Sequence, residues 1–312
     1  MGRISALLVC LALALALALG ACGGQPSEPA APSATQDAAF PVTIEAANGD
    51  VGIPARPERI VSLSATATEM LFAIGAGDQV VAVDDQSDYP PGVPTTDLSG
   101  YEPNVEAIAK YEPDLVVTTS QSGLKSLVDI SIPLLVHPAV TSLDDAYTQF
   151  EQLGVATGHV ADAAEEVAKI KSQIQDVVAT VPEFEEPPTY YHELDNTYFT
   201  ATSDTFIGQI YELAGLRNIA DKADKAGSGY PQLSAEYIVQ ADPDLIFLAD
   251  SECCNQTPER VAQRPGWDQI SAVKNDAIFD VGDDISSRWG PRVVDFLKTV
   301  VDAIRDLEPA HQ

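Results

Sequence analysis

The most reactive side chains in the sequence are two adjacent cysteines. Cys253 and Cys254 follow the apolar run LIFLAD, which ends at Asp250. Adjacent thiols could close a strained vicinal disulfide, remain reduced and partly buried, or ligate a soft metal ion. Two neighbouring ligands do not form a zinc site, because tetrahedral sites draw on spaced pairs. We therefore favour the disulfide over buried thiols and rank metal ligation last.

The histidines offer a second route to metal chemistry. Of four histidines, His137 (LLVHPAV) and His192 (YYHELD) end apolar strands, and Glu193 follows the latter. Capture of Zn²⁺ or Mn²⁺ by these side chains is one alternative function. The lack of a histidine-rich loop argues against a receptor for bare metal ions. We predict neither a metal site nor a resident cofactor.

Motifs of common enzyme classes are missing from the sequence. It contains no GxSxG, no glycine-rich phosphate loop and no HExxH. Asp and Glu number 47, so no acid–base pair stands out among them. We predict a binding protein without catalytic residues.

The N-terminus has the pattern of an export signal. Residues 1–21 place Arg3 before a Leu/Ala-rich run, and small residues follow. A membrane-spanning helix is the alternative. However, Leu19-Gly20-Ala21-Cys22 resembles the lipobox of bacterial lipoproteins, which implies acylation of Cys22. Residues 22–41 are small, polar and Pro-rich, as in a flexible tether. We expect an exported protein, lipid-anchored to the outer face of the cytoplasmic membrane.

Charge and size narrow the remaining classes. The formal net charge of −30 would repel a nucleic-acid backbone. Cys10 is lost with the signal and Cys22 to lipid, so no disulfide framework remains and an apolar core must supply stability. About 270 residues follow the tether, enough for two lobes.

Two stretches occur twice in the chain. Residues 71–83 (LFAIGAGDQVVAV) are echoed by 211–220 (YELAGLRNIA), and 105–120 (VEAIAKYEPDLVVTTS) by 235–250 (AEYIVQADPDLIFLAD). In the second pair, a helical pattern stops at an acid-Pro-Asp turn and a short apolar strand follows. This alternation predicts an α/β fold of two lobes, each a mostly parallel sheet flanked by helices. One larger doubly wound domain is the alternative.

A long helix connects the predicted lobes. Residues 161–181 lack glycine and proline, and Val167, Ile170 and Ile174 recur at helical spacing. We assign 42–158 to the N-terminal lobe, 159–182 to the connecting helix and 183–312 to the C-terminal lobe. Ligands bind beyond the carboxyl ends of parallel strands. The loops expected there are Ser62–Thr66, Ser99–Glu102, Thr118–Gly123, Leu194–Tyr198, Ser251–Gln256 and Asp283–Arg288.

From Arg59 to the last helix, the chain resembles substrate-binding proteins of ABC importers for iron chelates and cobalamin. The segments PERIVSLSATATEMLFAIGAGDQVVAVDD, SDYPP, NVEAIAKYEPDLVV, RPGWDQISAVKNDAIFDV and SRWGPRVVDFL carry the resemblance. It implies two lobes joined by a stiff helix, with a ligand cleft between them. It also implies partners: an ABC permease with its ATPase, and a metal chelate. We expect a monomer.

The resemblance assigns permease docking to Glu69 and Glu212, one on each lobe. Glu69 lies six residues before Gly75, whereas Glu212 lies three before Gly215. The two glutamates are thus one helical turn apart in the repeat, on the same face. For Glu69 a capping box that begins at Thr66 is the structural alternative.

The candidate ligand-binding residues are aromatic or basic. By resemblance, Arg288 lies at the cleft mouth, where a guanidinium could pair with oxygens of a chelate. Pairing with Asp283 or Asp284 is the alternative for Arg288, and core packing the alternative for Trp289. Tyrosines suit a macrocycle or an aromatic chelator, although ordinary half-buried packing is the alternative for each. The tyrosine candidates are Tyr101, Tyr230, Tyr89 and Tyr198.

Together these features predict a lipid-tethered receptor that binds a ferric siderophore or cobalamin and delivers it to a permease. A surface lipoprotein without a transport role is a further alternative. The sequence does not choose between the two chelates.

Overall fold

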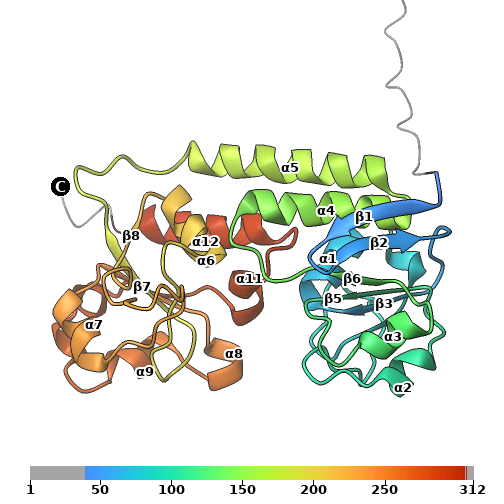
Figure 1. Ribbon diagram of the computed structural model, residues 1–312. Helices are drawn as coiled ribbons and strands as arrows, with labels where there is room; N and C mark the ends of the chain where they lie inside the picture. The colour runs from blue at the N-terminus through green and yellow to red at the C-terminus, as the bar shows by residue number, and fades with distance from the viewer. Residues whose placement is uncertain (1–38, 306, 308–312) are drawn as a thin grey trace, which may run out of the picture. The chain divides into compact units, whose positions relative to one another are not determined.

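The computed structural model describes residues 39–305 and 307, which form an antiparallel hairpin and two parallel sheets (Figure 1). Strand β1 (Val42–Ala46) pairs with β2 (Gly49–Ile53) in the hairpin. Within the described part of the chain, no helix has both the length and the apolarity needed to cross a membrane. The predicted signal, Cys22 and most of the predicted tether lie outside the described residues.

The N-terminal sheet has the strand order β4-β3-β5-β6, and all of its neighbouring strands are parallel. Every residue of β3, β5 and β6 is buried, because helices cover both faces of the sheet. This explains why these strands read as continuous apolar runs. The elements are β3 (Ile60–Leu63), α1 (Ala65–Ala73), η1 (Gly77–Gln79), β4 (Val80–Val83), α2 (Val105–Ala109), β5 (Leu115–Thr118), α3 (Lys125–Asp129) and β6 (Leu134–Val136).

The C-terminal sheet repeats this topology, with the order β8-β7-β9-β10 and parallel pairing throughout. In each lobe the first strand lies between the second and the third, which confirms the predicted duplicated α/β fold. Its strands are β7 (Thr189–Glu193), β8 (Arg217–Asn218), β9 (Leu245–Leu248) and β10 (Ile278–Asp280). Its helices are α6 (Phe206–Leu213), α7 (Ala235–Ala241), α8 (Ser251–Cys254), α9 (Pro258–Ala262), η2 (Trp267–Gln269), α10 (Ser271–Lys274), α11 (Asp283–Ser287) and α12 (Val293–Arg305).

The repeated Pro-Asp-Leu turn has the same structural role in both lobes. The carboxylate of Asp114 accepts the backbone N–H of Arg59, just before β3, at 2.9 Å. The carboxylate of Asp244 accepts the backbone N–H of Thr189, at the start of β7, at 2.8 Å. Each aspartate therefore joins the start of its lobe's third strand to the start of the first strand, which satisfies a backbone donor at the sheet end.

Two long helices connect the sheets. Helix α5 (Val160–Val178) lies within the predicted connecting helix, and its buried Val167, Ile170 and Ile174 face the core as predicted. Helix α4 (Leu143–Thr157) was not predicted from the sequence, and it runs beside α5 (Figure 1). A Cβ at Gly154 would lie 2.5 Å from the Cβ of Ala163. This glycine therefore allows the close approach of the two helices.

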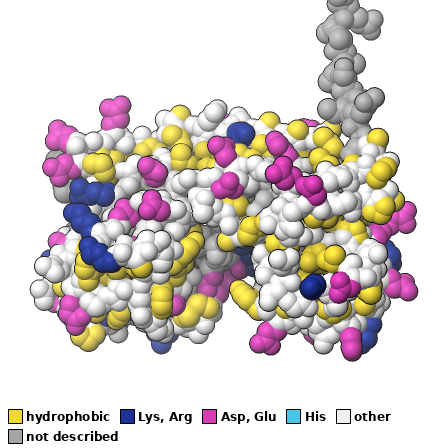
Figure 2. Space-filling model, in the orientation of Figure 1, with side chains coloured by type: hydrophobic (Ala, Val, Ile, Leu, Met, Phe, Trp, Pro, Cys, Tyr) yellow, Lys and Arg dark blue, Asp and Glu magenta, His cyan; other side chains and the backbone are white. Residues whose placement is uncertain are grey.

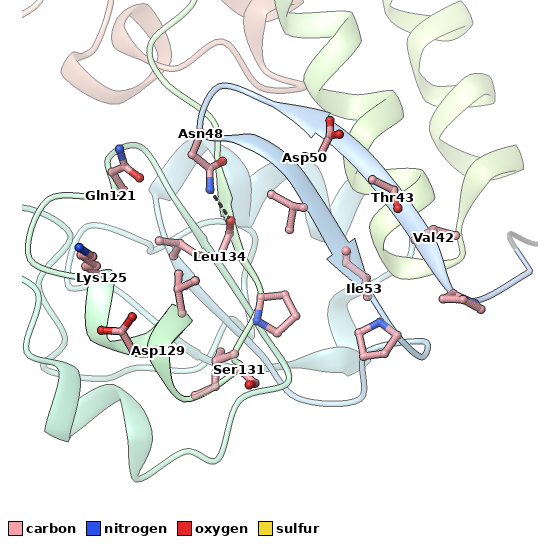
Figure 3. A pocket seen from close by; sticks show the side chains of 17 residues that line it. Val42, Thr43, Asn48, Asp50, Ile53, Gln121, Lys125, Asp129, Ser131 and Leu134 are labelled. Carbon is pink, nitrogen blue, oxygen red and sulfur yellow. Dashed lines mark hydrogen bonds between the residues drawn. The ribbon is translucent and has the colours of Figure 1, made fainter.

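The hairpin closes one edge of the N-terminal sheet. Strand β6 is the edge strand, and its outward backbone groups meet the side chain of Asn48 in the hairpin turn (Figure 3). The Asn48 amide donates to Leu134 O at 2.9 Å and accepts from Val136 N at 3.3 Å. One side-chain amide thus takes the place of a neighbouring strand's peptide group.

Candidate functional site

A cavity of about 260 Å³ lies between the two lobes. The N-terminal lobe contributes Asp88 and Tyr89, from the segment after β4. The C-terminal lobe contributes residues of α8 and α11 and Arg292, which directly precedes α12. These elements follow the carboxyl ends of β4, β9 and β10, where ligands bind in parallel sheets. Two of the predicted loops there are short helices, α8 and α11. Figure 2 shows the surface hollowed between the lobes, with acidic side chains in the hollow.

One buried carboxylate joins the lobes beside this cavity. Glu69 of α1 is 1% exposed, and both of its oxygens accept hydrogen bonds from arginines of the other lobe. Arg292 donates from Nε at 3.0 Å and from Nη2 at 2.5 Å, and Arg288 donates from Nη1 at 3.0 Å. Burial alone would lower the pKa of Arg292, but the hydrogen bonds to Glu69 and the negative charges of Glu69 and Asp284 together outweigh burial and raise that pKa. The paired, charged state is therefore stabilised.

Arg288 makes further bonds to both lobes. Its guanidinium donates to Asp284 in its own lobe at 2.5 Å, and to Asp88 at 3.1 Å and Gln86 O at 2.9 Å in the other lobe. Its side chain is 9% exposed. Arg288 thus pairs with Asp284, which was the alternative for this residue, and its bonds to Asp88 and Asp284 place it behind two residues that line the cavity. Its contact with a ligand stays a prediction. Both Nη atoms of the guanidinium therefore donate within the protein.

The structure corrects the predicted docking role of Glu69. A carboxylate that is buried and bound by two arginines presents no charge at the surface for a permease. The predicted capping box is also wrong, since α1 begins at Ala65 and the cap is Ser64, whose hydroxyl accepts the N–H of Ala67. Glu212, on α6, is exposed and has no such constraint, so its docking role stays a prediction.

Trp289 packs between the lobes rather than in the cavity. Its indole N–H donates to Gln149 Oε1 of α4 at 2.7 Å, and its ring packs against the main hydrophobic core. The next residue, Gly290, is buried against Glu69, and a Cβ there would lie 3.2 Å from Glu69 Oε2. The segment before α12 therefore approaches the ion-paired glutamate closely because it carries a glycine.

The four tyrosine candidates occupy different environments. Tyr89 lines the inter-lobe cavity and is 39% exposed. The centre of its ring lies 4.3 Å from the guanidinium carbon of Arg292. Tyr101 is 88% exposed, and Tyr230 is about half exposed. Burial of its ring raises the pKa of Tyr230. Tyr198 packs against Trp267 within the C-terminal lobe. Only Tyr89 lines the cavity, so the structure does not bring the four together there.

The two cysteines are free thiols in α8, and the predicted vicinal disulfide is not formed. The ring closed by such a bond is strained, whereas residues 251–254 have ordinary helical backbone. Cys253 is exposed and Cys254 is half-buried. Although Cys253 is exposed as a residue, partial desolvation of its sulfur raises the pKa of the thiol, and hydrogen bonding to Cys254 raises it further. The thiol is therefore protonated and weakly nucleophilic.

The predicted histidine candidates are buried and neutral. Burial lowers the pKa of His137 to about 4 and that of His192 to about 3. His192 shares a hydrogen bond of 2.8 Å with the hydroxyl of Tyr211 inside the C-terminal core. Among residues 39–305 and 307, no group of three His, Cys, Asp or Glu side chains could hold a metal ion. The Zn²⁺ or Mn²⁺ alternative therefore finds no donor set in this part of the chain.

Two buried acidic residues, Glu193 and Asp250, lie next to the start of α8. Glu193, at the end of β7, receives two hydrogen bonds of 2.6 Å from Arg264. Asp250, just before α8, is fully buried, and both of its carboxyl oxygens lack a hydrogen-bond partner. Burial and the adjacent Glu193 raise the pKa of Asp250 to about 8. Asp250 is thus protonated at neutral pH, which avoids two like charges side by side.

A hollow larger than the inter-lobe cavity lies elsewhere. A groove of about 1060 Å³ separates the hairpin from α3 and the start of β6 (Figure 3). Asn48, Leu134 and Lys125 are among the side chains on its walls. All of its lining residues belong to the N-terminal lobe. The position at the strand carboxyl ends, and contributions from both lobes, favour the smaller cavity as the functional site.

Comparison with known proteins shows the family of this chain. A model of the periplasmic binding protein family matches residues 60–285. An uncharacterized ABC transporter substrate-binding lipoprotein of Bacillus subtilis is 31% identical over 304 residues, which cover 94% of each chain.

The chain belongs to the periplasmic binding protein family.

Two further similarities bear on fold and ligand. A cobalamin-binding protein of Halobacterium salinarum is 30% identical over 98% of this chain and 85% of its own. The crystal structure of a possible iron-binding periplasmic solute-binding protein from Staphylococcus epidermidis superposes with a TM-score of 0.71. It is 28% identical and covers 80% of this chain and 99% of its own. The two-lobed α/β architecture is therefore that of periplasmic binding proteins.

Sequence reasoning missed several charged residues of this periplasmic binding protein's cavity. Asp88, Glu252, Asp284 and Arg292 all line it, yet none was a candidate for ligand binding. Asp88 lies in SDYPP and Arg292 in SRWGPR, two segments that carry the family resemblance. Their place in those segments was a usable signal, but which charges face one another across the lobes depends on contacts some 200 residues apart in sequence.

Proposed function

We propose that the protein is an extracytoplasmic solute-binding lipoprotein of an ABC importer. It binds a metal chelate, either a ferric siderophore or cobalamin, between its lobes and delivers it to the permease. The observation that carries the proposal is the inter-lobe cavity, which is lined from both lobes by segments that follow strand carboxyl ends. A cavity shared by two lobes can enclose a ligand that one lobe would leave half exposed.

The lobes must part to admit such a ligand. Pockets for drug-sized molecules have volumes of roughly 300–1,000 Å³, and a chelate as large as cobalamin needs at least the upper end. The cavity of about 260 Å³ is smaller. The bonds from Arg288 and Arg292 to Glu69 and Asp88 cross between the lobes and resist opening. Ligand affinity therefore includes the cost of separating these pairs.

The names of relatives order the candidate ligands. The cobalamin-binding relative covers nearly the whole chain, so a corrinoid is the first ligand to test. The possible iron-binding protein of similar structure makes a ferric siderophore the second. The same site geometry serves both, since each is a bulky metal complex held within an organic ligand.

Thermal unfolding with added chelate tests the binding function. A ligand at 100 times its Kd stabilises the folded state by about 2.7 kcal/mol. For a protein of this size the melting temperature then rises by about 5 °C or more. Cyanocobalamin and ferrioxamine B serve as ligands, with the metal-free hydroxamate as control. Mass spectrometry of small molecules that co-purify with the protein identifies the natural ligand. No shift with any chelate would refute the proposal and favour a surface lipoprotein without a transport role.

Anchoring and docking complete the proposed function. Cys22, which lies outside the described residues, would carry the lipid, and Cys22→Ala is expected to release the protein from the membrane fraction. Exposed Glu212 would meet the permease. Glu212→Ala is expected to reduce chelate uptake without weakening chelate binding, whereas Glu165→Ala, on exposed α5 surface, should leave both unchanged. Equal uptake by the two variants would remove Glu212 from the docking surface.

A further inference from the structure

The charged groups that line the inter-lobe cavity are mostly acidic. Three carboxylates, from Asp88, Glu252 and Asp284, face it, with a single guanidinium, that of Arg292. Asp88 and Glu252 are exposed to solvent, while the side chain of Asp284 is 30% exposed. A ligand that enters the cavity meets these oxygens at close range.

The nearby arginines do not offset this charge. Arg292 is bound through Nε and Nη2 to the buried carboxylate of Glu69. Arg288 is shared among Glu69, Asp88 and Asp284. With Glu69 included, the two guanidinium groups are thus matched by carboxylates of the protein itself. In the described part of the chain, the Glu252 carboxylate receives no side-chain hydrogen bond and forms no ion pair, so no cation offsets it at the cavity.

Further acids stand behind the lining. Asp283 accepts the backbone N–H groups of Glu252 and Cys253, and Asp280 accepts the hydroxyl of Ser251. Partial burial, and then the charges of Asp284, Asp283, Asp88 and Asp280, raise the pKa of Glu252. Asp284 has a raised pKa as well, because burial and Asp88 outweigh Arg288. These carboxylates therefore repel one another already in the absence of a ligand.

The negative field persists when the lobes separate. Asp88 belongs to the N-terminal lobe, and Glu252 and Asp284 belong to the C-terminal lobe. Opening breaks the bonds between Arg288 and Asp88 and frees the latter carboxylate. Each lobe then presents at least one carboxylate to the widened cleft. An anionic ligand is repelled by both lobes, and a cationic ligand is attracted by both.

We propose that this cleft selects its chelate by charge: it binds complexes that are neutral or positively charged and rejects complexes that carry negative charge. The inference rests on the proposed function and names the ligand class of the same site. Neutral corrinoids and cationic or neutral ferric hydroxamates are accepted, whereas ferric catecholates and carboxylate-rich complexes are excluded. Tyr89, whose ring lies under the guanidinium carbon of Arg292, supplies an uncharged contact surface for accepted ligands.

A matched ligand series tests the inference, because it changes charge while it keeps shape. Ferrioxamine B carries +1, its N-acetyl derivative is neutral, and its N-succinyl derivative carries −1. On the corrin frame, aquacobalamin, cyanocobalamin and cyanocobalamin monocarboxylic acid form a parallel series. Dissociation constants are measured by intrinsic fluorescence at about 20 mM and about 500 mM salt. We expect the anionic member to bind roughly tenfold more weakly than the neutral one at low salt, and the gap to narrow at high salt.

Two variants locate the effect. Glu252→Gln removes one cavity charge without removing a side-chain hydrogen bond. We expect it to reduce the ratio of the dissociation constants of the anionic and neutral ligands roughly threefold. Glu165→Gln makes the same charge change on exposed α5 surface and should leave the gap unchanged. Unfolding curves of both variants report whether the fold is intact.

The possible outcomes separate the inference from the proposed function. If neither series binds in any charge state, the proposed function fails. If the anionic member binds as tightly as the neutral one, the charge selection is wrong while the receptor function stands. A gap that Glu252→Gln and Glu165→Gln narrow equally would also overturn the assignment to the cavity, since a general effect of the net charge of −30 would then explain it.

Discussion

Removal of the Glu69 carboxylate should destabilise the protein far more than removal of a surface glutamate. Glu69→Ala deletes an acceptor of three hydrogen bonds. Arg292 then has no carboxylate partner among the described residues, and its side chain is only 15% exposed. Breaking a buried ion pair costs about 3–5 kcal/mol. Arg288 keeps Asp88 and Asp284, so we expect the lower end, about 3 kcal/mol.

Urea unfolding followed by far-UV circular dichroism measures this cost. With a slope of about 3 kcal/mol per molar urea, the midpoint should fall by about 1 M. Glu212→Ala is the matched control, because Glu212 is also helical but exposed, and it should change stability by less than about 0.5 kcal/mol. A double-mutant cycle with Glu69→Gln and Arg292→Gln should give a coupling above about 1 kcal/mol. Stability of Glu69→Ala within about 0.5 kcal/mol of wild type would refute the buried inter-lobe pair.

Three further outcomes are expected. Because the pKa of Asp250 is raised from 3.8 to about 8, the folded state holds a proton that the unfolded state releases. The free energy of unfolding, measured by urea titration, should therefore fall as pH rises from about 4 to 8. Asp250→Asn should flatten this pH dependence. Gly208→Ala should lower the free energy of unfolding by about 1–3 kcal/mol, because a Cβ there would lie 2.2 Å from Thr202 O. Gly52→Ala, where a Cβ meets no atom within 4 Å, should lower it much less when both variants are compared by thermal unfolding. Equal losses would contradict the packing of α6. Cys253 should react with a maleimide in the native protein, slowly at pH 7 and faster at higher pH, since its thiol pKa is raised; a mass two hydrogens lower before reduction would contradict the free thiols.

The sequence predicts the fold well because its signals are local and repeated. The Pro-Asp-Leu turns mark the ends of α2 and α7 and the starts of buried strands in both lobes, as observed. The apolar positions of α5 likewise follow from helical spacing. What stays hidden is the role of each motif. The sequence does not show that Asp114 and Asp244 reach back to the first strands, since that needs the sheet to be formed.

The candidate site was less predictable because its pairs are distant in sequence. Glu69 and Arg292 are 223 residues apart, and only the folded chain brings them together. One local signal for burial did exist, because Glu69 is the only charged residue in α1 and apolar or small residues surround it. The cysteines illustrate a different limit. Adjacent thiols are chemically able to join, and only the helical backbone of α8 shows that they do not.

Asn48 has a consequence beyond its own two hydrogen bonds. The outermost strand of a sheet is a template on which a second molecule can add its own backbone, and natural proteins block such templates to avoid aggregation. Here a turn amide occupies the donor and acceptor of β6 that a neighbour would need. A second molecule therefore cannot extend the N-terminal sheet by pairing its backbone with this strand.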